Sequence, residues 1–138
     1  MKIMNAVNSG MKNFCKTLGF KLESGSKLGK NVYGVSIPLT KGEKTYYFYL
    51  YFKKDFLKRV AMRFFKEFNE NDLTDLSREV ANQVIGHTKN ILEKNEPGYK
   101  LGLPEFLGKV ERFPIKFDNS KIYKIKNRTF KIGYTIDG

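Results

Sequence analysis

Residues 72–92 read DLTDLSREVANQVIGHTKNIL, and their apolar positions recur every three or four residues. At about 100° per residue these positions share one face of a helix and leave the opposite face polar. The stretch therefore predicts a long amphipathic helix that packs one face against the rest of the fold. The predicted core face consists of Leu76, Val80, Ala81, Val84, Ile85, Ile91 and Leu92.

The polar face of this helix holds Glu79 and Asn82 one turn apart, and Gly86 follows one turn later. Because Gly86 adds no side chain, the face is expected to present a carboxylate and a carboxamide on a flat surface suited to docking against another protein. A glutamate and an asparagine at this spacing are also common on solvated helices, so the pair alone assigns no function.

Two helices and a hairpin are predicted before this segment. The first helix covers 4–18 and ends at Gly19. Alternating apolar residues predict strands over 33–39 and 46–52, joined by a turn at 41–43. A second helix is predicted over 55–68, with a buried stripe made of Leu57, Val60, Ala61, Phe64, Phe65 and Phe68.

The second face of the return strand carries Tyr47, Tyr49 and Tyr51. Three large aromatic side chains on that face indicate that it is at least partly covered. Either a helix or loop of the same chain packs on it, or it forms a subunit interface, where tyrosine is enriched.

Three further strands are predicted in the last third of the chain, over 113–117, 123–125 and 130–136, with a turn at 126–128. The resulting order is α-β-β-α-α-β-β-β. This order predicts an α+β fold in which helices pack on a largely antiparallel sheet. A length of 138 residues is typical of one domain, so we expect a single domain over 1–138.

Composition restricts the classes of function. The chain is 41% hydrophobic and 29% charged, which is typical of a folded domain. The longest apolar run, 46–52, is too short to span a membrane, and the first residues lack the apolar core of a signal peptide. One cysteine, Cys15, and one histidine, His87, argue against a His/Cys zinc site. Both are expected to pack in or beside the core, and a lone cysteine suits a reducing, cytoplasmic compartment.

The formal net charge is +12, and lysines are scattered over nearly every segment. Three interpretations remain open from the charge alone: solvated faces with no specific partner, an acidic protein partner, and nucleic acid. A nucleic-acid interface would more typically gather its cations into one stripe.

The 72–92 segment resembles the signature helix of the CheC/CheX/FliY family of chemotaxis phosphatases. Asp75, Glu79, Asn82, Gly86 and the apolar residues around them match its pattern, including Ile85 and Leu92. The stretch 101–104, with Gly108 beyond it, is similar to the family's Gly-x-Pro segment. The resemblance covers most of 31–136, and the presence of one Glu-x-x-Asn helix makes the chain similar to the single-site CheX type.

This resemblance implies hydrolysis of the aspartyl phosphate on a CheY-like receiver domain. Asn82 would position the attacking water, and Glu79 would pair with the receiver's lysine. Asp75, Gln83, Gly86 and Asn90 would contact the partner. The resemblance implies no cofactor of the chain's own, because the receiver supplies Mg²⁺, and it implies a homodimer, formed through the tyrosine face or the final strands.

Two other functions remain open. The same fold could serve as a non-catalytic module that binds a receiver or a component of the flagellar motor. The excess of positive charge leaves a nucleic-acid-binding domain as a third reading.

Overall fold

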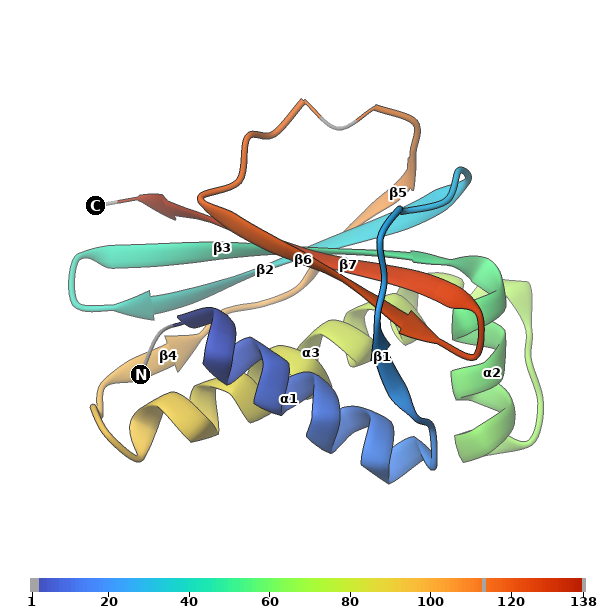
Figure 1. Ribbon diagram of the computed structural model, residues 1–138, viewed down its shortest axis with the longest axis horizontal. Helices are drawn as coiled ribbons and strands as arrows, with labels where there is room; N and C mark the ends of the chain where they lie inside the picture. Colours follow the sequence, from blue (N-terminus) through green and yellow to red (C-terminus); the bar gives the residue numbers. More distant parts are fainter. Residues whose placement is uncertain (1–2, 113, 138) are drawn as a thin grey trace.

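The computed structural model describes residues 3–112 and 114–137 and places its helices on one face of an antiparallel sheet (Figure 1). This arrangement confirms the predicted α+β fold. The helices are α1 (Ile3–Leu18), α2 (Lys54–Phe65) and α3 (Leu73–Glu93), and the 3-10 turn η1 (Glu70–Asp72) precedes α3. The strands are β1 (Leu22–Ser24), β2 (Val32–Lys41), β3 (Lys44–Lys53), β4 (Tyr99–Leu101), β5 (Glu105–Val110), β6 (Asn119–Ile125) and β7 (Arg128–Asp137).

The sheet has the order β1-β6-β7-β3-β2-β4, and β5 also pairs with β2. In the central hairpin Lys41 lies opposite Lys44, so Gly42 and Glu43 make the turn, and Gly42 has a φ of 59°. A positive φ suits a two-residue hairpin turn and costs glycine nothing. The helix-facing side of the hairpin is fully buried at Val35, Ile37, Leu39, Phe48, Leu50 and Phe52.

The opposite face of the sheet is covered by the connection between β5 and β6, which arches over it in Figure 1. Phe117 lies against Gly133, where an added Cβ would come within 2.6 Å of the ring. The same ring packs against Tyr49 and Tyr51, with centroids 5.7 and 6.2 Å away. A loop of the same chain therefore covers these two tyrosines, whereas Tyr47 is 38% exposed.

The predicted strand over 113–117 is wrong. Phe113 lies outside the described residues, and residues 114–117 form a loop. Alternation of Ile115 and Phe117 suggested a strand, but Phe117 instead packs flat on the sheet surface at Gly133. Apolar residues at every second position indicate which side chains are buried. They do not distinguish a strand from a loop that lies across a sheet, because both can bury alternate side chains.

Three short strands were not predicted: β1, β4 and β5. In β5 a register shift places Gly34 opposite Gly108 and Val35 opposite Phe106, so Leu107 is an extra, bulged residue. Gly108 has a φ of 75° at this bulge. A bulge interrupts the alternation on which strand prediction depends. β1 and β4 each cover only three residues, too few to show a period.

The helix α1 lies close against α3, and Gly10 is the point of closest approach. A Cβ on Gly10 would fall 2.6 Å from Thr88 Oγ1 and 2.9 Å from the carbonyl oxygen of Val84. The Thr88 hydroxyl donates a hydrogen bond of 2.9 Å to the same carbonyl, so it is buried with a partner. This contact fixes which face of α3 is buried.

The helix α2 is shorter than predicted and buries a different face. It ends at Phe65, and Lys66 takes a left-handed conformation with a φ of 60°. Its buried side chains lie within residues 56–61 and are Phe56, which the predicted stripe omitted, Leu57, Val60 and Ala61. Phe64 and Phe65 were expected in the core, but in the last turn they are 48% and 63% exposed, and Phe68 lies beyond the helix and is half-buried.

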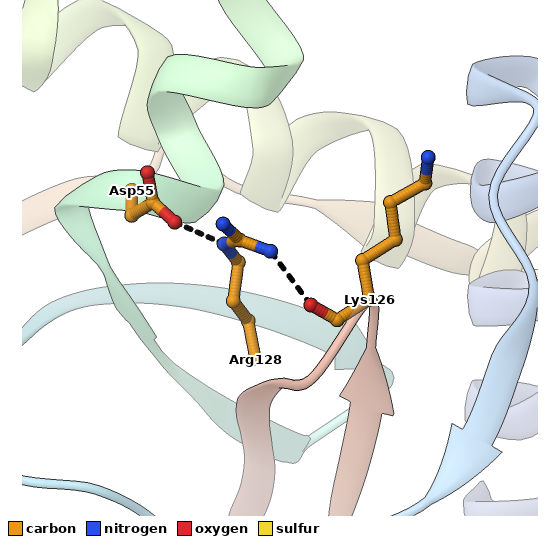
Figure 2. A network of polar contacts seen from close by, with 3 residues as sticks. All are labelled: Asp55, Lys126 and Arg128. Atoms are coloured by element: carbon orange, nitrogen blue, oxygen red, sulfur yellow. Dashed lines mark hydrogen bonds and ion pairs between the residues drawn. The ribbon is translucent and has the colours of Figure 1, made fainter.

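The start of α2 is tied to the β6–β7 turn. Figure 2 shows Arg128 donating from Nε to Asp55 and from a terminal nitrogen to the carbonyl oxygen of Lys126, the latter at 2.6 Å. Lys126 and Asn127 both have positive φ values, 49° and 63°, as a type I′ hairpin turn requires. The predicted turn at 126–128 is thus confirmed, and its arginine holds α2 at that end of the sheet.

Candidate functional site

The orientation of α3 agrees with the prediction that its Glu-x-x-Asn pair faces outward. Glu79 is exposed and Asn82 is half-buried, so neither lies in the core. Six of the seven predicted core residues are buried, and Ile91 is half-buried at the edge. The buried face also includes Ser77 and Thr88, whose hydroxyls bond to carbonyl oxygens one turn earlier at 2.8 and 2.9 Å. Such bonds allow a hydroxyl to be buried on an otherwise apolar face.

A hydrogen bond orients the Glu79 carboxylate. Gln83, one turn further along α3, donates from Nε2 to Glu79 Oε1 at 2.9 Å. Both side chains are exposed, so the second carboxylate oxygen can still accept from a partner. Gln83 was predicted to contact the partner, and in the structure its side chain is hydrogen-bonded to Glu79.

On the other side of Glu79, α3 faces the β4 edge of the sheet. A Cβ on Gly86 would meet nothing nearer than Leu101 Cδ2 at 4.0 Å, so packing inside the chain does not require glycine there. The missing side chain therefore leaves open surface beside Asn82. Asn90, predicted as a partner contact, is exposed one turn beyond Gly86.

Asp75 is exposed in the first turn of α3 and lies 3.9 Å from Arg78. At this exposure the ion pair contributes little to stability. The carboxylate also complements the partial positive charge at the start of a helix. The position of Asp75, one turn before Glu79, makes the predicted partner residues a continuous row along α3.

A groove runs along one side of this row, between the end of α2 and the first half of α3. It has a volume of about 640 Å³, which is within the usual range for binding pockets. Its floor is apolar and includes Phe14 from α1. It is lined by Phe14, Val60, Ala61, Phe64, Phe65, Glu67, Asp72, Asp75, Leu76, Glu79, Val80 and Gln83.

This groove was not predicted, because Phe64 and Phe65 were expected in the core. The one feature of the sequence that could have indicated exposed aromatic residues is the pair Phe64 and Phe65 followed by Lys66 and Glu67, where the apolar stripe ends. Whether such residues are buried depends on what lies opposite them, and that is decided by α3 and α1.

Two further reactive side chains are Cys15 in α1 and His87, which directly follows Gly86 in α3. Cys15 is 1% exposed, and burial raises the pKa of its thiol to about 11. A thiol of this kind packs as a small apolar side chain and is not an activated nucleophile. His87 is half-buried beside the core face of α3. Within 3–112 and 114–137, no three His, Cys, Asp or Glu side chains converge where they could hold a metal.

The segment predicted to match the family's Gly-x-Pro stretch links β4 to β5 alongside β2. The Gly102 amide donates to the carbonyl oxygen of Pro38 at 2.8 Å, and a Cβ on Gly102 would lie 2.5 Å from Pro38 Cγ. Glycine is needed here for a close approach of two chains. Leu103 follows and is 89% exposed.

Comparisons with known proteins identify the fold. Neither a protein-family model nor a curated protein matches this sequence. Among solved structures, the chemotaxis protein CheX from Vibrio vulnificus matches with a TM-score of 0.81 at 16% identity, over 99% of this chain and 97% of that chain. A CheC-like superfamily protein from Shewanella sp. PV-4 matches with a TM-score of 0.79 at 21% identity, over all of both chains.

A third match comes from the CheX–CheY–BeF3–Mg²⁺ complex of Borrelia burgdorferi, with a TM-score of 0.68 at 15% identity over 99% of this chain and 96% of that chain. The chain therefore has the fold of CheX and CheC-like chemotaxis proteins, as the resemblance of its α3 sequence implied. No helix in the described part of the chain is long and apolar enough to cross a bilayer.

Proposed function

We propose that this chain is a CheX-like phosphatase that hydrolyses the aspartyl phosphate of a CheY-like receiver domain in chemotaxis. The observation that carries the proposal is the outward placement of Glu79 and Asn82, one turn apart on α3, in a chain with the CheX fold. The complex of a similar protein with CheY supports a receiver as the partner.

Asn82 is the residue that would act on the water. Its carboxamide offers both a donor and an acceptor, so it can hold one water molecule in a defined direction. Phosphoryl transfer depends mostly on positioning and charge stabilisation, and an acyl phosphate is already reactive. Asn82 therefore needs no titratable base beside it. The receiver would bring its own Mg²⁺, and this chain contributes no cofactor.

Glu79 would set the docking angle by pairing with the receiver's lysine. The bond from Gln83 restricts the carboxylate before the partner arrives, which reduces the side-chain entropy lost on binding. Asp75, Gly86 and Asn90 extend the contact along the exposed row of α3. The open surface at Gly86 would let the receiver approach Asn82 closely.

The test is phosphate release from CheY-type receivers of the same genome, phosphorylated with acetyl phosphate. The wild type should accelerate release, and Asn82→Ala should reduce the maximal rate on the order of 100-fold because the water is no longer positioned. Receiver binding by Asn82→Ala should be unchanged. The matched control is Asn13→Ala, which removes an exposed carboxamide from α1 and should leave the rate unchanged.

Other outcomes separate the alternatives. Binding of the receiver without acceleration of phosphate release would leave a non-catalytic docking module on the same fold. An equal rate for Asn82→Ala and the wild type would remove Asn82 from the mechanism.

A homodimer is also proposed, and the structure limits which of the surfaces expected from the sequence are free to form it. Phe117 covers two of the three tyrosines, and β7 lies between β3 and β6. Among the described strands, β5 pairs only with β2 and carries Leu107 at 39% exposure, so it is the better edge for a second copy. Sedimentation at high concentration should give a dimer, and a monomer would contradict the proposal.

A further inference from the structure

The groove between α2 and α3 exposes aromatic surface beside the Glu79–Asn82 row. Phe64 and Phe65 are 48% and 63% exposed, with ring centroids 6.4 Å apart, and they form one wall. The floor consists of side chains that are almost fully buried, among them Phe14, Val60 and Val80. An aromatic wall over an apolar floor is typical of a pocket that anchors a partner side chain.

The charge of the groove is opposite to that of the whole chain. The net charge is +12, yet the charged residues that line the groove are all carboxylates, namely Glu67, Asp72, Asp75 and Glu79. Three of the four cations of α2, Lys58, Arg59 and Arg63, line a separate cleft, together with Phe20, Met62 and one carboxylate, Asp55. The helix α2 thus separates an acidic groove from a basic cleft.

The groove and the proposed catalytic row share residues. Glu79 and Gln83 line the groove and are also hydrogen-bonded to each other within the row. Any protein that covers Glu79 must therefore lie over the open side of the groove. Local acidity selects a partner surface with lysine or arginine around its apolar part, because like charges across an interface are strongly unfavourable.

We propose that this groove is the affinity-determining half of the receiver site, and that it seats an apolar side chain of the receiver flanked by lysine or arginine. This inference rests on the proposed function for the identity of the partner. It assigns binding to Phe64, Phe65 and the acidic rim, and leaves chemistry to Asn82. It also predicts that mutations in the groove weaken receiver binding without changing the maximal rate, whereas mutation of Asn82 lowers the maximal rate without changing binding.

The test uses Phe65→Ser and measures phosphate release against receiver concentration, with the same acetyl-phosphate-treated receivers. The half-maximal receiver concentration should rise about tenfold or more at an unchanged maximal rate. Met62→Ser is the matched control, because Met62 is 48% exposed on the same helix but lines the other cleft. It should leave both parameters as in the wild type.

A second arm tests the acidic rim. The double variant Glu67→Gln/Asp75→Asn should raise the half-maximal concentration and make it depend less on ionic strength, since exposed charge pairs are screened by salt. Glu43→Gln, an exposed carboxylate in the β2–β3 turn, is the control and should do neither.

The outcomes distinguish this inference from the proposed function. An active wild type with the same half-maximal concentration in Phe65→Ser would overturn the groove and leave the phosphatase. A wild type that binds the receiver without acceleration, and loses that binding in Phe65→Ser, would support the groove and overturn the phosphatase. Absence of receiver binding would overturn the receiver as the occupant of the groove. A wild-type dimer that Phe65→Ser converts to a monomer would also overturn it, and would assign the groove to a second copy of this chain.

Discussion

The helix α3 is flanked by two helices that meet it in contrasting ways. On the α1 side, Gly10 brings the two backbones together around Thr88, and the contact is closed. On the α2 side, the two helices contact each other little, and the space between them is the groove. Far more of α3 contacts α1 than α2. The comparison shows that a close contact fixes the orientation of α3, whereas a loose one leaves surface available for a partner.

The largest expected effect is on the free energy of unfolding, and it should differ between the floor of the groove and its wall. Phe14 is 2% exposed and reaches from α1 to the groove floor. Phe14→Ala should lower the free energy of unfolding by about 3–5 kcal/mol, as is usual for removal of a buried aromatic ring. Phe65→Ala, at 63% exposure, should change it by no more than about 0.5 kcal/mol. Urea unfolding measures both, and similar losses for the two would mean that the groove wall is part of the core.

A smaller effect is expected from adding a side chain at Gly10, where α1 lies close against α3. Alanine favours a helix over glycine by about 1 kcal/mol, but its Cβ would collide with Thr88 Oγ1 and with the Val84 carbonyl. Gly10→Ala should therefore be destabilising by about 1–3 kcal/mol. Ser9→Ala, on the same helix and half-buried, should be neutral or slightly stabilising. A stabilised Gly10→Ala protein would show that the α1–α3 contact is not closed.

The smallest effect concerns pH, through the thiol of Cys15 on the closed side. Burial raises its pKa from 9.0 to about 11, so in that interval the unfolded chain holds fewer protons than the folded one. Stability should therefore fall as pH rises from about 9 to 11, with at most about 1 kcal/mol per pH unit coming from this thiol. Below pH 9 the contribution is constant.

The measurement compares wild type with Cys15→Ala across this range, because Tyr51 and Tyr123 also have pKa values raised by burial and act in the same direction at higher pH. The stability of the variant should fall less steeply. Parallel curves would indicate that the thiol reaches solvent in the folded protein.

Several elements with strong periodicity were predictable from the sequence, although the stripe predicted over 55–68 was wrong at Phe64 and Phe65. The helix over 72–92, the helix over 4–18 and the two hairpins all bury the faces that their spacing indicated. Two segments were mispredicted for opposite reasons. In β5 a bulge at Leu107 interrupts the alternation, whereas Ile115 and Phe117 alternate although they lie in a loop. For the candidate site, the sequence placed Glu79 and Asn82 on the outer face of α3, because a long helix has one rotation that buries its apolar stripe.

The row from Asp75 to Asn90 and the side of α3 on which it lies could be predicted from residue order alone, since both follow from the spacing of residues along one helix. The packing of the helices was needed to show that Phe64 and Phe65 are exposed and that four carboxylates line one groove of a basic protein. It also showed that Gln83 is hydrogen-bonded to Glu79 beside that groove. The physical reason is that periodicity is a property of one element. A groove and its local charge are properties of the space between elements, which exists only after α1, α2 and α3 have packed together.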